Sequence, residues 1–310
     1  MDSTMSAARG DAAFVESRRP LLLPSFLPAA RYLMTGESSV AHGYRLVCVP
    51  ESDVGPIQTY ADDYGLGRWL RVARTWAPGK GRLMRNSLRH GMNVIEIGAN
   101  IGYFTALAAR AVGSSGHVLA VEADPKTFSL LRTNVEMNHF DNVELLPVAA
   151  HRYAGLITST RDPGNDVDDP AYVGSEARQA TPLQAVRLDD VLDPDVPIHF
   201  VTVDVGGMGH AAIEGLARTI QNWRPRILVE FNPQKIGWFG DDPHAVLALY
   251  RELGLEIGVL GWDALRLRNE TDMDIDELIL DSFAFSSDAD AEITERTRQI
   301  GLINLVLKSK

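Results

Sequence analysis

Two glycines at a strand-to-helix junction constrain the fold of this chain more than any other feature. Gly98 and Gly102 stand between a buried-strand run over 93–97 (NVIEI) and a helical pattern over 103–112. Glycine allows a tight turn and a close backbone approach to a ligand, and the helix that follows presents unpaired amides at its N-terminus. The pair therefore predicts either a nucleotide-sized pocket or a tight turn without a ligand.

An acidic side chain ends the next strand run, about twenty residues beyond the glycines. Glu122 closes the run 117–122 (HVLAVE), and a carboxylate at the end of a parallel strand can accept both hydroxyls of a ribose. Asp124, directly before Pro125, instead suits the N-cap of a helix expected over 125–138. Loop and acid together favour the nucleotide pocket.

Strand and helix patterns alternate along the rest of the chain. Strands are expected over 142–148, 198–205, 226–231, 255–260 and 302–307, and helices near 210–222 and 242–253. This alternation predicts βαβ units, hence an α/β fold whose mainly parallel sheet carries helices on both faces. The last two expected strands, 255–260 and 302–307, lack a clear helix between them, so they could be antiparallel.

Two segments stand outside this alternation. Residues 1–90 are of mixed character and are expected to form an N-terminal lobe, with 91–310 as the main domain. The segment 158–182 is rich in Asp, Gly, Pro and Ser. A long polar insertion in a compact domain is typically functional or disordered, so a lid over substrate and a mobile surface loop are both open.

Composition narrows the class of partner and compartment. The 310 residues include 30 basic and 41 acidic side chains, a formal charge of −11 that repels nucleic-acid phosphates. The one cysteine, Cys48, cannot form an internal disulfide, which fits a reducing cytoplasm. The apolar stretch 20–28 contains three prolines and is shorter than the roughly 20 residues of a membrane span. We expect a cytoplasmic protein with no nucleic-acid or membrane partner, and a loose or packing arm at 20–28.

The residues of the glycine loop distinguish between nucleotides. Dinucleotide folds prefer a Gly-x-Gly-x-x-Gly loop, in which small residues surround the pyrophosphate. Here Glu96 precedes the first glycine and Asn100 lies between the two. A carboxylate at this place repels phosphate but suits a ligand with an ammonium and a sulfonium group. S-adenosylmethionine carries both charges and no phosphate, so the loop favours it as cofactor.

The run over 90–105 (HGMNVIEIGANIGYFT) resembles the opening motif of the FkbM-type S-adenosylmethionine-dependent methyltransferases. The resemblance continues in order over 121–125, 134–143, 188–192, 203–205 and 224–231. It implies a Rossmann-like class I methyltransferase with a mainly parallel seven-stranded sheet. It also implies O-methylation of a small metabolite, sugar or glycoside, as in bacterial secondary metabolism.

The resemblance implies a role for particular positions. Glu96 would lie beneath the methionine part of the cofactor, Glu122 would bind the ribose, and Asp204 would lie near the transferred methyl. The other cofactor-binding positions that it implies are Gly98, Ala99, Asn100, Gly102, Tyr103, Ala123 and Ala149.

One segment departs from the family pattern. The family reads Asp-Val-Glu-Gly followed by a small residue and a second glutamate, whereas this chain reads DVGGMGH over 204–210, with Gly206 and Gly209 in place of both glutamates. This leaves open a methyltransferase-fold protein with altered, non-methylating chemistry, or a degenerate ligand-binding scaffold. His210 either serves as a base near neutral pH or faces solvent at a helix start. His199, inside a strand run, is expected to be a packed core histidine.

Three side chains are candidates for the chemistry of methyl transfer: Asp204, Glu230 and His210. Glu230 is included because carboxylates at the ends of parallel strands face the ligand crevice. Each would remove the hydroxyl proton directly or through a divalent ion such as magnesium, which Asp204 and Glu230 would hold. The expected partners are a hydroxylated or glycosylated small molecule and a second copy of the chain in a homodimer.

Aromatic residues offer two interpretations. Tyr60, Tyr64, Trp69 and Trp76 lie in a short span of the N-terminal lobe. They either pack the lobe onto the core or wall an acceptor pocket. Trp238 and Phe239, beyond a strand end, favour acceptor contact, with the lobe and the 158–182 segment closing over the acceptor.

Overall fold

The computed structural model describes residues 20–23, 44–159, 181–260, 283–284, 294, 297 and 301–309. Most of the expected lid, 160–180, therefore lies outside the described residues, as do residues 24–28 of the expected arm. Within the described part, no helix is both long and apolar enough to cross a bilayer.

The central sheet has the strand order β12-β11-β13-β10-β9-β3-β4-β5 in the described part of the chain. Its strands are β3 (Asn93–Ile97), β4 (His117–Val121), β5 (Val143–Leu146), β9 (Phe200–Val203), β10 (Arg226–Phe231), β11 (Leu255–Val259), β12 (Phe283–Ala284) and β13 (Ile303–Ser309). The run from β5 to β10 is parallel, and β13 lies antiparallel between β10 and β11. The seven expected strands are all present, the two-residue β12 adds an eighth at the edge, and the Rossmann-like α/β fold is confirmed.

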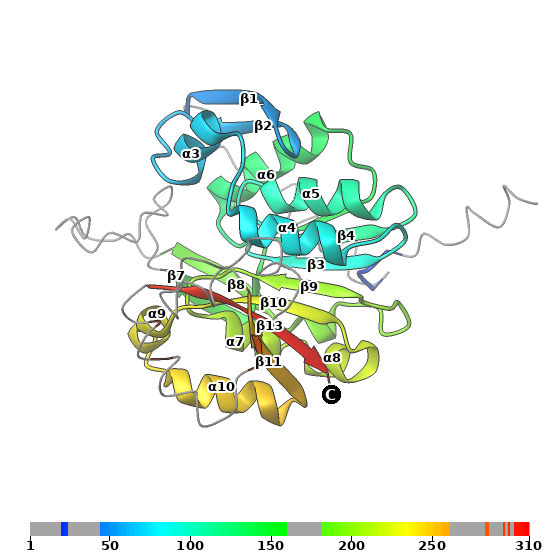
Figure 1. Ribbon diagram of the computed structural model, residues 1–310, viewed down its shortest axis with the longest axis vertical. Coiled ribbons are helices and arrows are strands. Elements are labelled where there is room, and N and C mark those ends of the chain that lie inside the picture. The colour runs from blue at the N-terminus through cyan, green and yellow to red at the C-terminus, as the bar shows by residue number, and fades with distance from the viewer. Residues whose placement is uncertain are drawn as a thin grey trace, which may run out of the picture.

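Helices cover both faces of this sheet (Figure 1). The helices are α3 (Leu66–Ala73), α4 (Pro78–Ser87), α5 (Tyr103–Val112), α6 (Pro125–Met137), α7 (Gly209–Glu214), α8 (Ala217–Trp223), α9 (Pro233–Trp238) and α10 (Pro243–Glu252). Alternate residues of a strand point to opposite faces. In β3, Val94 packs with α4 and α5, whereas Ile95 and Ile97 pack with α7, α8 and α10. The unbroken apolar runs of the strands follow from this two-sided burial.

The segment before the main sheet packs closely onto it. The antiparallel strands β1 (Leu46–Ser52) and β2 (Gly55–Tyr60), with α3 and α4, share one hydrophobic cluster with α5 and the sheet. Asn134 of α6 ties β2 to the main domain, since its side chain accepts from the Gln58 amide and donates to the Gln58 carbonyl. The division into 1–90 and 91–310 stays a prediction.

The structure describes the start of the expected 20–28 arm and both ends of the expected 158–182 lid. Leu21 and Leu22 are buried in the core, and their amides donate to Glu144, so this part of the expected arm packs. The ends of the expected lid lie in β7 (Gly155–Ser159) and β8 (Thr181–Val186), an antiparallel pair that forms a small sheet with β6 (Ala149–Ala150).

Candidate functional site

The parallel register brings the main site candidates to one edge of the sheet. Ile97 at the end of β3 pairs with the last residues of both β4 and β9, and Val203 of β9 pairs with Val229 of β10. Gly98, Glu122 and Asp204 each come one residue after a paired strand end, and Glu230 follows Val229. The structure thus places the glycine loop and three acidic residues at the carboxyl edge, where ligands of open α/β sheets bind.

The glycine loop needs its glycines for geometric reasons. Gly98 has φ +81° and Gly102 has φ +91°, in the left-handed region that side chains disfavour. A Cβ on Gly98 would overlap the Asp204 carbonyl oxygen, and one on Gly102 would lie 2.7 Å from Leu131 Cδ1. The turn therefore presses the end of β3 against the end of β9, and no side chain separates the loop from Asp204.

Glu122 is buried and held by the loop that it faces. Its Oε2 accepts from the Asn100 amide at 2.9 Å, and its Oε1 accepts from the Asp124 amide at 2.9 Å. The two backbone amides fix the orientation of this carboxylate at the loop. Asp124 is the N-cap of α6, as expected, and accepts from the Thr127 amide.

Glu96 points to the face that carries α4 and α5. It is 3% exposed, and the Thr105 hydroxyl donates to its Oε2 at 2.5 Å. Burial raises the pKa of Glu96 to about 8, with the charges of Asp204 and Glu122 adding to the rise. Burial therefore favours the protonated form of Glu96.

Asp204 lies between a lysine and a second acid. Lys80 Nζ of α4 donates to Asp204 Oδ2 at 2.8 Å, and the lysine is 5% exposed whereas Asp204 is 37% exposed. Burial raises the pKa of Glu230 well above its ordinary value, and the charge of Asp204 and a hydrogen bond to it raise it further. Burial thus favours the protonated form of Glu230, and a hydrogen bond links it to Asp204.

The remaining cofactor candidates are placed near this edge with different environments. Ala99 is buried, and Ala123 and Ala149 are half-buried. The Tyr103 hydroxyl donates to Asp53 Oδ1 at 2.6 Å, which ties it to the β1–β2 turn. Any contact of Tyr103 with a cofactor would come from its ring or backbone.

The two histidines lie in environments that the sequence did not predict. His210, in the first turn of α7, is 2% exposed, so solvent exposure was the wrong expectation. Its Nε2 lies 3.0 Å from Asp241 Oδ2, and its buried Nδ1 has no partner among the described residues. His199 lies before β9 and is exposed, with Nδ1 accepting from the Asn93 amide, so the expected core packing was also wrong.

The loop over 206–209, which contains the two glycines at the family glutamate positions, is closely packed. Gly206 and Gly207 have φ of +53° and +95°. A Cβ on Gly207 would lie 2.8 Å from the backbone carbon of Lys235 in α9, and one on Gly209 would lie 3.0 Å from Val229 Cγ2. A Cβ on Gly206 would meet only the Lys235 side chain, at 3.9 Å.

The aromatic residues divide between packing and exposure. Tyr60 is buried, and its hydroxyl donates to the Lys126 carbonyl, as the packing interpretation expects. Tyr64, Trp69, Trp238 and Phe239 are exposed, and Trp76 packs partly against the core and edge-on to Trp69.

The expected magnesium ion finds no support in the donor set. Across residues 44–159, 181–260 and the shorter described stretches, no group of three or more His, Cys, Asp or Glu side chains is placed to hold a metal. Asp204 Oδ2, which would be a ligand, is already bound by an ammonium group.

Sequence reasoning missed Lys80, Thr105 and Asp53. Lys80 stands in the segment PGKGRL, which carries no recognisable motif. Thr105 could have been found from helical spacing, because the third residue of a helix that follows a glycine turn faces back over the strand before it.

Comparison with known proteins adds a family and partial relatives. The family model described as Methyltransferase FkbM domain matches residues 96–257. The Protein-L-isoaspartate O-methyltransferase of Methanothrix thermoacetophila is 42% identical over 59 residues, 19% of this chain and 28% of that protein. The Arsenite methyltransferase of Halobacterium salinarum is 39% identical over 66 residues, 19% of this chain and 17% of that protein. This chain spans less than a third of the length of either relative.

The solved structures that match this chain are distant from it in sequence. The Methyltransferase FkbM from Methylobacillus flagellatus KT has a TM-score of 0.38 and 16% identity, with 55% of this chain and 40% of that chain covered. The O-methyltransferase from Bacillus cereus, in complex with SAH, has a TM-score of 0.39 and 18% identity, with 76% and 83% covered.

Proposed function

Because this chain belongs to the FkbM methyltransferase domain family, we propose that it transfers the methyl group of S-adenosylmethionine to a hydroxyl oxygen of a small metabolite or glycoside. One observation carries the proposal: the glycine loop, the doubly bound Glu122 and the partly exposed Asp204 meet at a single sheet edge. A cofactor held by the first two would leave its reactive end beside the third.

The residues of the loop fit this cofactor. S-adenosylmethionine supplies the methyl group on a sulfonium sulfur. Gly98 and Gly102 leave the loop backbone bare, and the oriented Glu122 carboxylate is the group that would accept from the ribose hydroxyls. Glu96 would lie beneath the methionine part, where a nearby cation would favour its ionised form.

Asp204 is the residue best placed to accept a proton. An alcohol is a weak nucleophile, so transfer is faster when a base takes the hydroxyl proton as the oxygen attacks the methyl carbon. Glu230 is buried and its pKa is raised, whereas Asp204 is 37% exposed and paired with the Lys80 ammonium. His210 is bound to Asp241 and would act by shaping the α7 start rather than as the base.

The protein's other task is alignment of the acceptor oxygen, the methyl carbon and the sulfur. The exposed rings of Trp238 and Phe239 follow β10 by one short helix, so they can stack against a sugar or a flat ring at the same edge. We propose that these rings and the segment before β3 form the acceptor side of the site.

A two-step experiment tests the proposal. Titration calorimetry with S-adenosylhomocysteine should show binding, and absence of binding would exclude every cofactor-dependent function. A screen of glycosides and hydroxylated metabolites with methyl-labelled S-adenosylmethionine, with magnesium or with EDTA, should then label an oxygen. Binding without label on any acceptor would favour the altered chemistry that Gly206 and Gly209 leave open.

A further inference from the structure

A buried polar patch lies between the sheet and α4. Val94, Phe200 and Leu228 belong to the hydrophobic cluster that includes α4 and α5. Two residues further along the same three strands are Glu96, Thr202 and Glu230. Because side chains two apart in a strand share a face, these polar groups point toward α4 and α5 as well. The apolar layer thus changes to a polar one as the strands approach the ligand edge.

This patch contains buried atoms without hydrogen-bond partners. Among the described residues, Glu230 Oε1 and Thr202 Oγ1 are both buried and unpaired. Buried polar atoms are nearly always satisfied by protein groups, ordered water or a ligand. Two orphaned oxygens on neighbouring strands, beside Asp204, therefore mark a place built to receive polar groups rather than a sealed core.

Lys80 is the cation that enters this patch from α4. It is 5% exposed, its Nζ lies 2.8 Å from Asp204 Oδ2 and 4.4 Å from the centre of the Phe104 ring, and its charge also acts on Glu96 and Glu230. Lys235 of α9 acts on Glu230 from another side. Burying an ammonium is costly unless it is paired, so the position of Lys80 depends on the Asp204 carboxylate.

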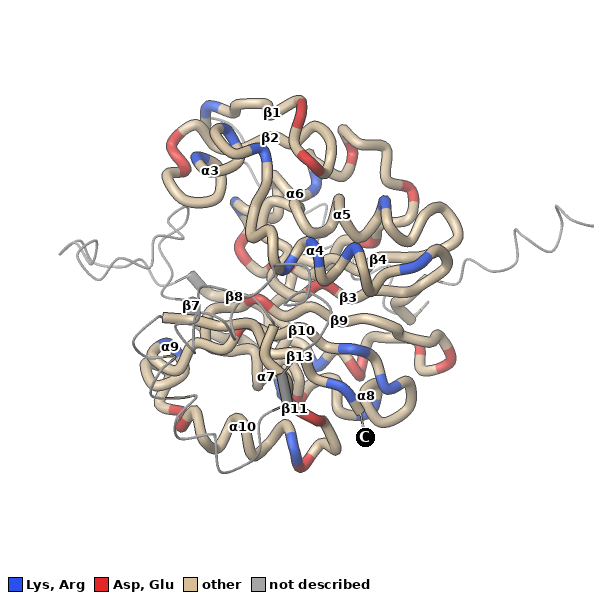
Figure 2. The backbone as a smooth tube through the Cα atoms, in the orientation of Figure 1, with Lys and Arg blue, Asp and Glu red and all other residues tan. Residues whose placement is uncertain are grey.

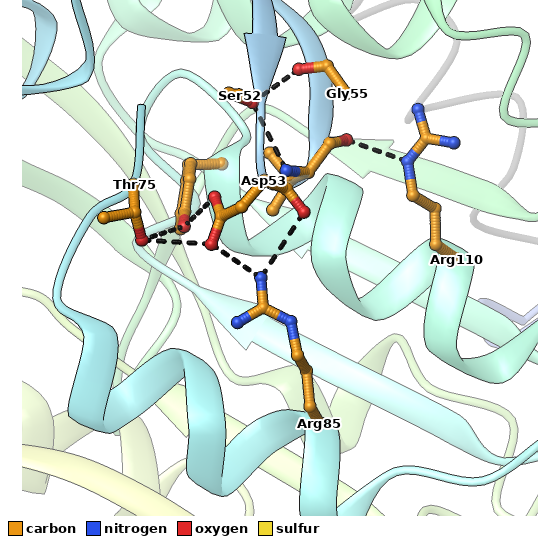
Figure 3. Close-up of polar contacts among 8 residues, drawn as sticks. Ser52, Asp53, Gly55, Thr75, Arg85 and Arg110 are labelled. Carbon is orange, nitrogen blue, oxygen red and sulfur yellow. Dashed lines mark hydrogen bonds and ion pairs between the residues drawn. The ribbon is translucent and has the colours of Figure 1, made fainter. Parts of the chain in front are cut away.

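The helix that carries Lys80 is fixed against the first turn of α5. Asp53 in the β1–β2 turn accepts hydrogen bonds from Arg85 of α4 at 2.8 Å and from Thr75 at 3.0 Å (Figure 3). It also accepts from the Tyr103 hydroxyl of α5 at 2.6 Å. Basic positions recur along α4 in Figure 2. Arg85 points to this surface network, whereas Lys80 is on the buried side of the helix.

We propose that Lys80 is a positioning residue for methyl transfer, which holds the Asp204 carboxylate oriented and charge-balanced beside the cofactor sulfur. This rests on the proposed function. Lys80 Nζ donates to Oδ2, and a hydrogen bond links the same carboxylate to Glu230, so two neighbours fix its orientation. The Lys80 ammonium also offsets the charge of the Asp204 carboxylate. An uncompensated carboxylate would bind the cationic sulfonium tightly before transfer, and such ground-state binding does not speed the reaction.

The test compares two ligands that differ in charge at sulfur and needs no acceptor. S-adenosylmethionine is cationic at sulfur and S-adenosylhomocysteine is neutral, so the ratio of their Kd values reports the local charge. In Lys80→Met, Asp204 loses its counter-charge, so the site should favour the cationic ligand more strongly. We expect the Kd of S-adenosylhomocysteine divided by the Kd of S-adenosylmethionine to rise at least about fivefold at about pH 8.5. If Lys80→Met does not fold, Lys80→Gln replaces it in the test. Its side chain can still donate a hydrogen bond but carries no charge, so the same rise in the Kd ratio is expected.

Two controls separate charge from structure. Lys80→Arg keeps the cation and should keep the ratio within about twofold of the wild type. Lys126→Met removes another buried lysine, which lies over the Tyr44 and Tyr60 rings, and should also leave the ratio unchanged. A ratio that is unchanged in folded Lys80→Met and Lys80→Gln overturns the role of Lys80. Failure of the wild type to bind S-adenosylhomocysteine overturns the proposed function itself.

Discussion

Replacing Glu96 by glutamine should change how the stability of this protein depends on pH. Glu96 is buried on the α4 and α5 face of β3, and burial raises its pKa from 4.5 to about 8. Below about pH 4.5 the side chain is neutral in both the folded and the unfolded chain and contributes no pH dependence. As the pH rises, the unfolded chain loses the proton first, so the wild type loses stability up to about pH 8.

The magnitude follows from the size of the shift. Each pKa unit is worth about 1.36 kcal/mol, so the full rise from 4.5 to about 8 is worth about 5 kcal/mol, of which about 3.5 kcal/mol develops between pH 5 and pH 8. Relaxation and water entry around a buried charge lower this, and we expect about 1 to 3 kcal/mol. Glu96→Gln cannot ionise and keeps a side-chain oxygen for the Thr105 hydroxyl.

Urea unfolding at pH 5, 6, 7 and 8, followed by circular dichroism, measures the effect. The free energy of unfolding of Glu96→Gln minus that of the wild type should increase by about 1 to 3 kcal/mol over this range. Glu136→Gln, an exposed acid on α6, serves as the matched control and should show a constant difference. A constant or falling difference for Glu96→Gln would refute the argument that its charge is excluded by burial.

Three further variants test the site and its support. Gly98→Ala should abolish S-adenosylhomocysteine binding in calorimetry because its Cβ would overlap the Asp204 carbonyl, whereas Gly237→Ala, with open space around it, should bind normally; normal binding by both would argue against the close approach. Asp204→Asn should bind S-adenosylhomocysteine within about threefold of the wild type but turn over at least about 100-fold more slowly, and unchanged turnover would remove it as the base. Asp53→Asn should lower the free energy of unfolding in urea by about 1 to 2 kcal/mol, since it weakens the Arg85, Tyr103 and Thr75 contacts, whereas exposed Asp190→Asn should change it by less than about 0.5 kcal/mol; equal effects would contradict a central role for Asp53.

The strands and helices of the main sheet could be predicted because their sequence patterns follow from burial on two faces. The residues 93–97, 103–112 and 226–231 form the elements expected of them, with the same bounds. The N-cap at Asp124 and the left-handed glycines at 98 and 102 were also predictable, since few residues tolerate those backbone positions.

The polar interior of the site was not predictable from local pattern. Glu96 reads as a carboxylate at a ligand edge, but its protonation depends on Thr105, Lys80 and the depth of burial, which are set by tertiary packing. His199 and His210 were assigned the wrong exposure, because one residue of displacement along a strand end or a helix start exchanges core for surface. Lys80 lies 124 positions from Asp204, a distance at which spacing carries no signal.

The contact between α4 and the end of β9 bears on how far the shared domain defines chemistry in this family. The matched region begins at Glu96, so the ammonium that faces Asp204 is contributed by chain that lies before it. Relatives that align well from the first strand onward can therefore carry a different charge next to the reacting oxygen, according to the helix that precedes that strand. Acceptor preference among such relatives would then depend on the helix before the matched domain as well as on the glycine loop.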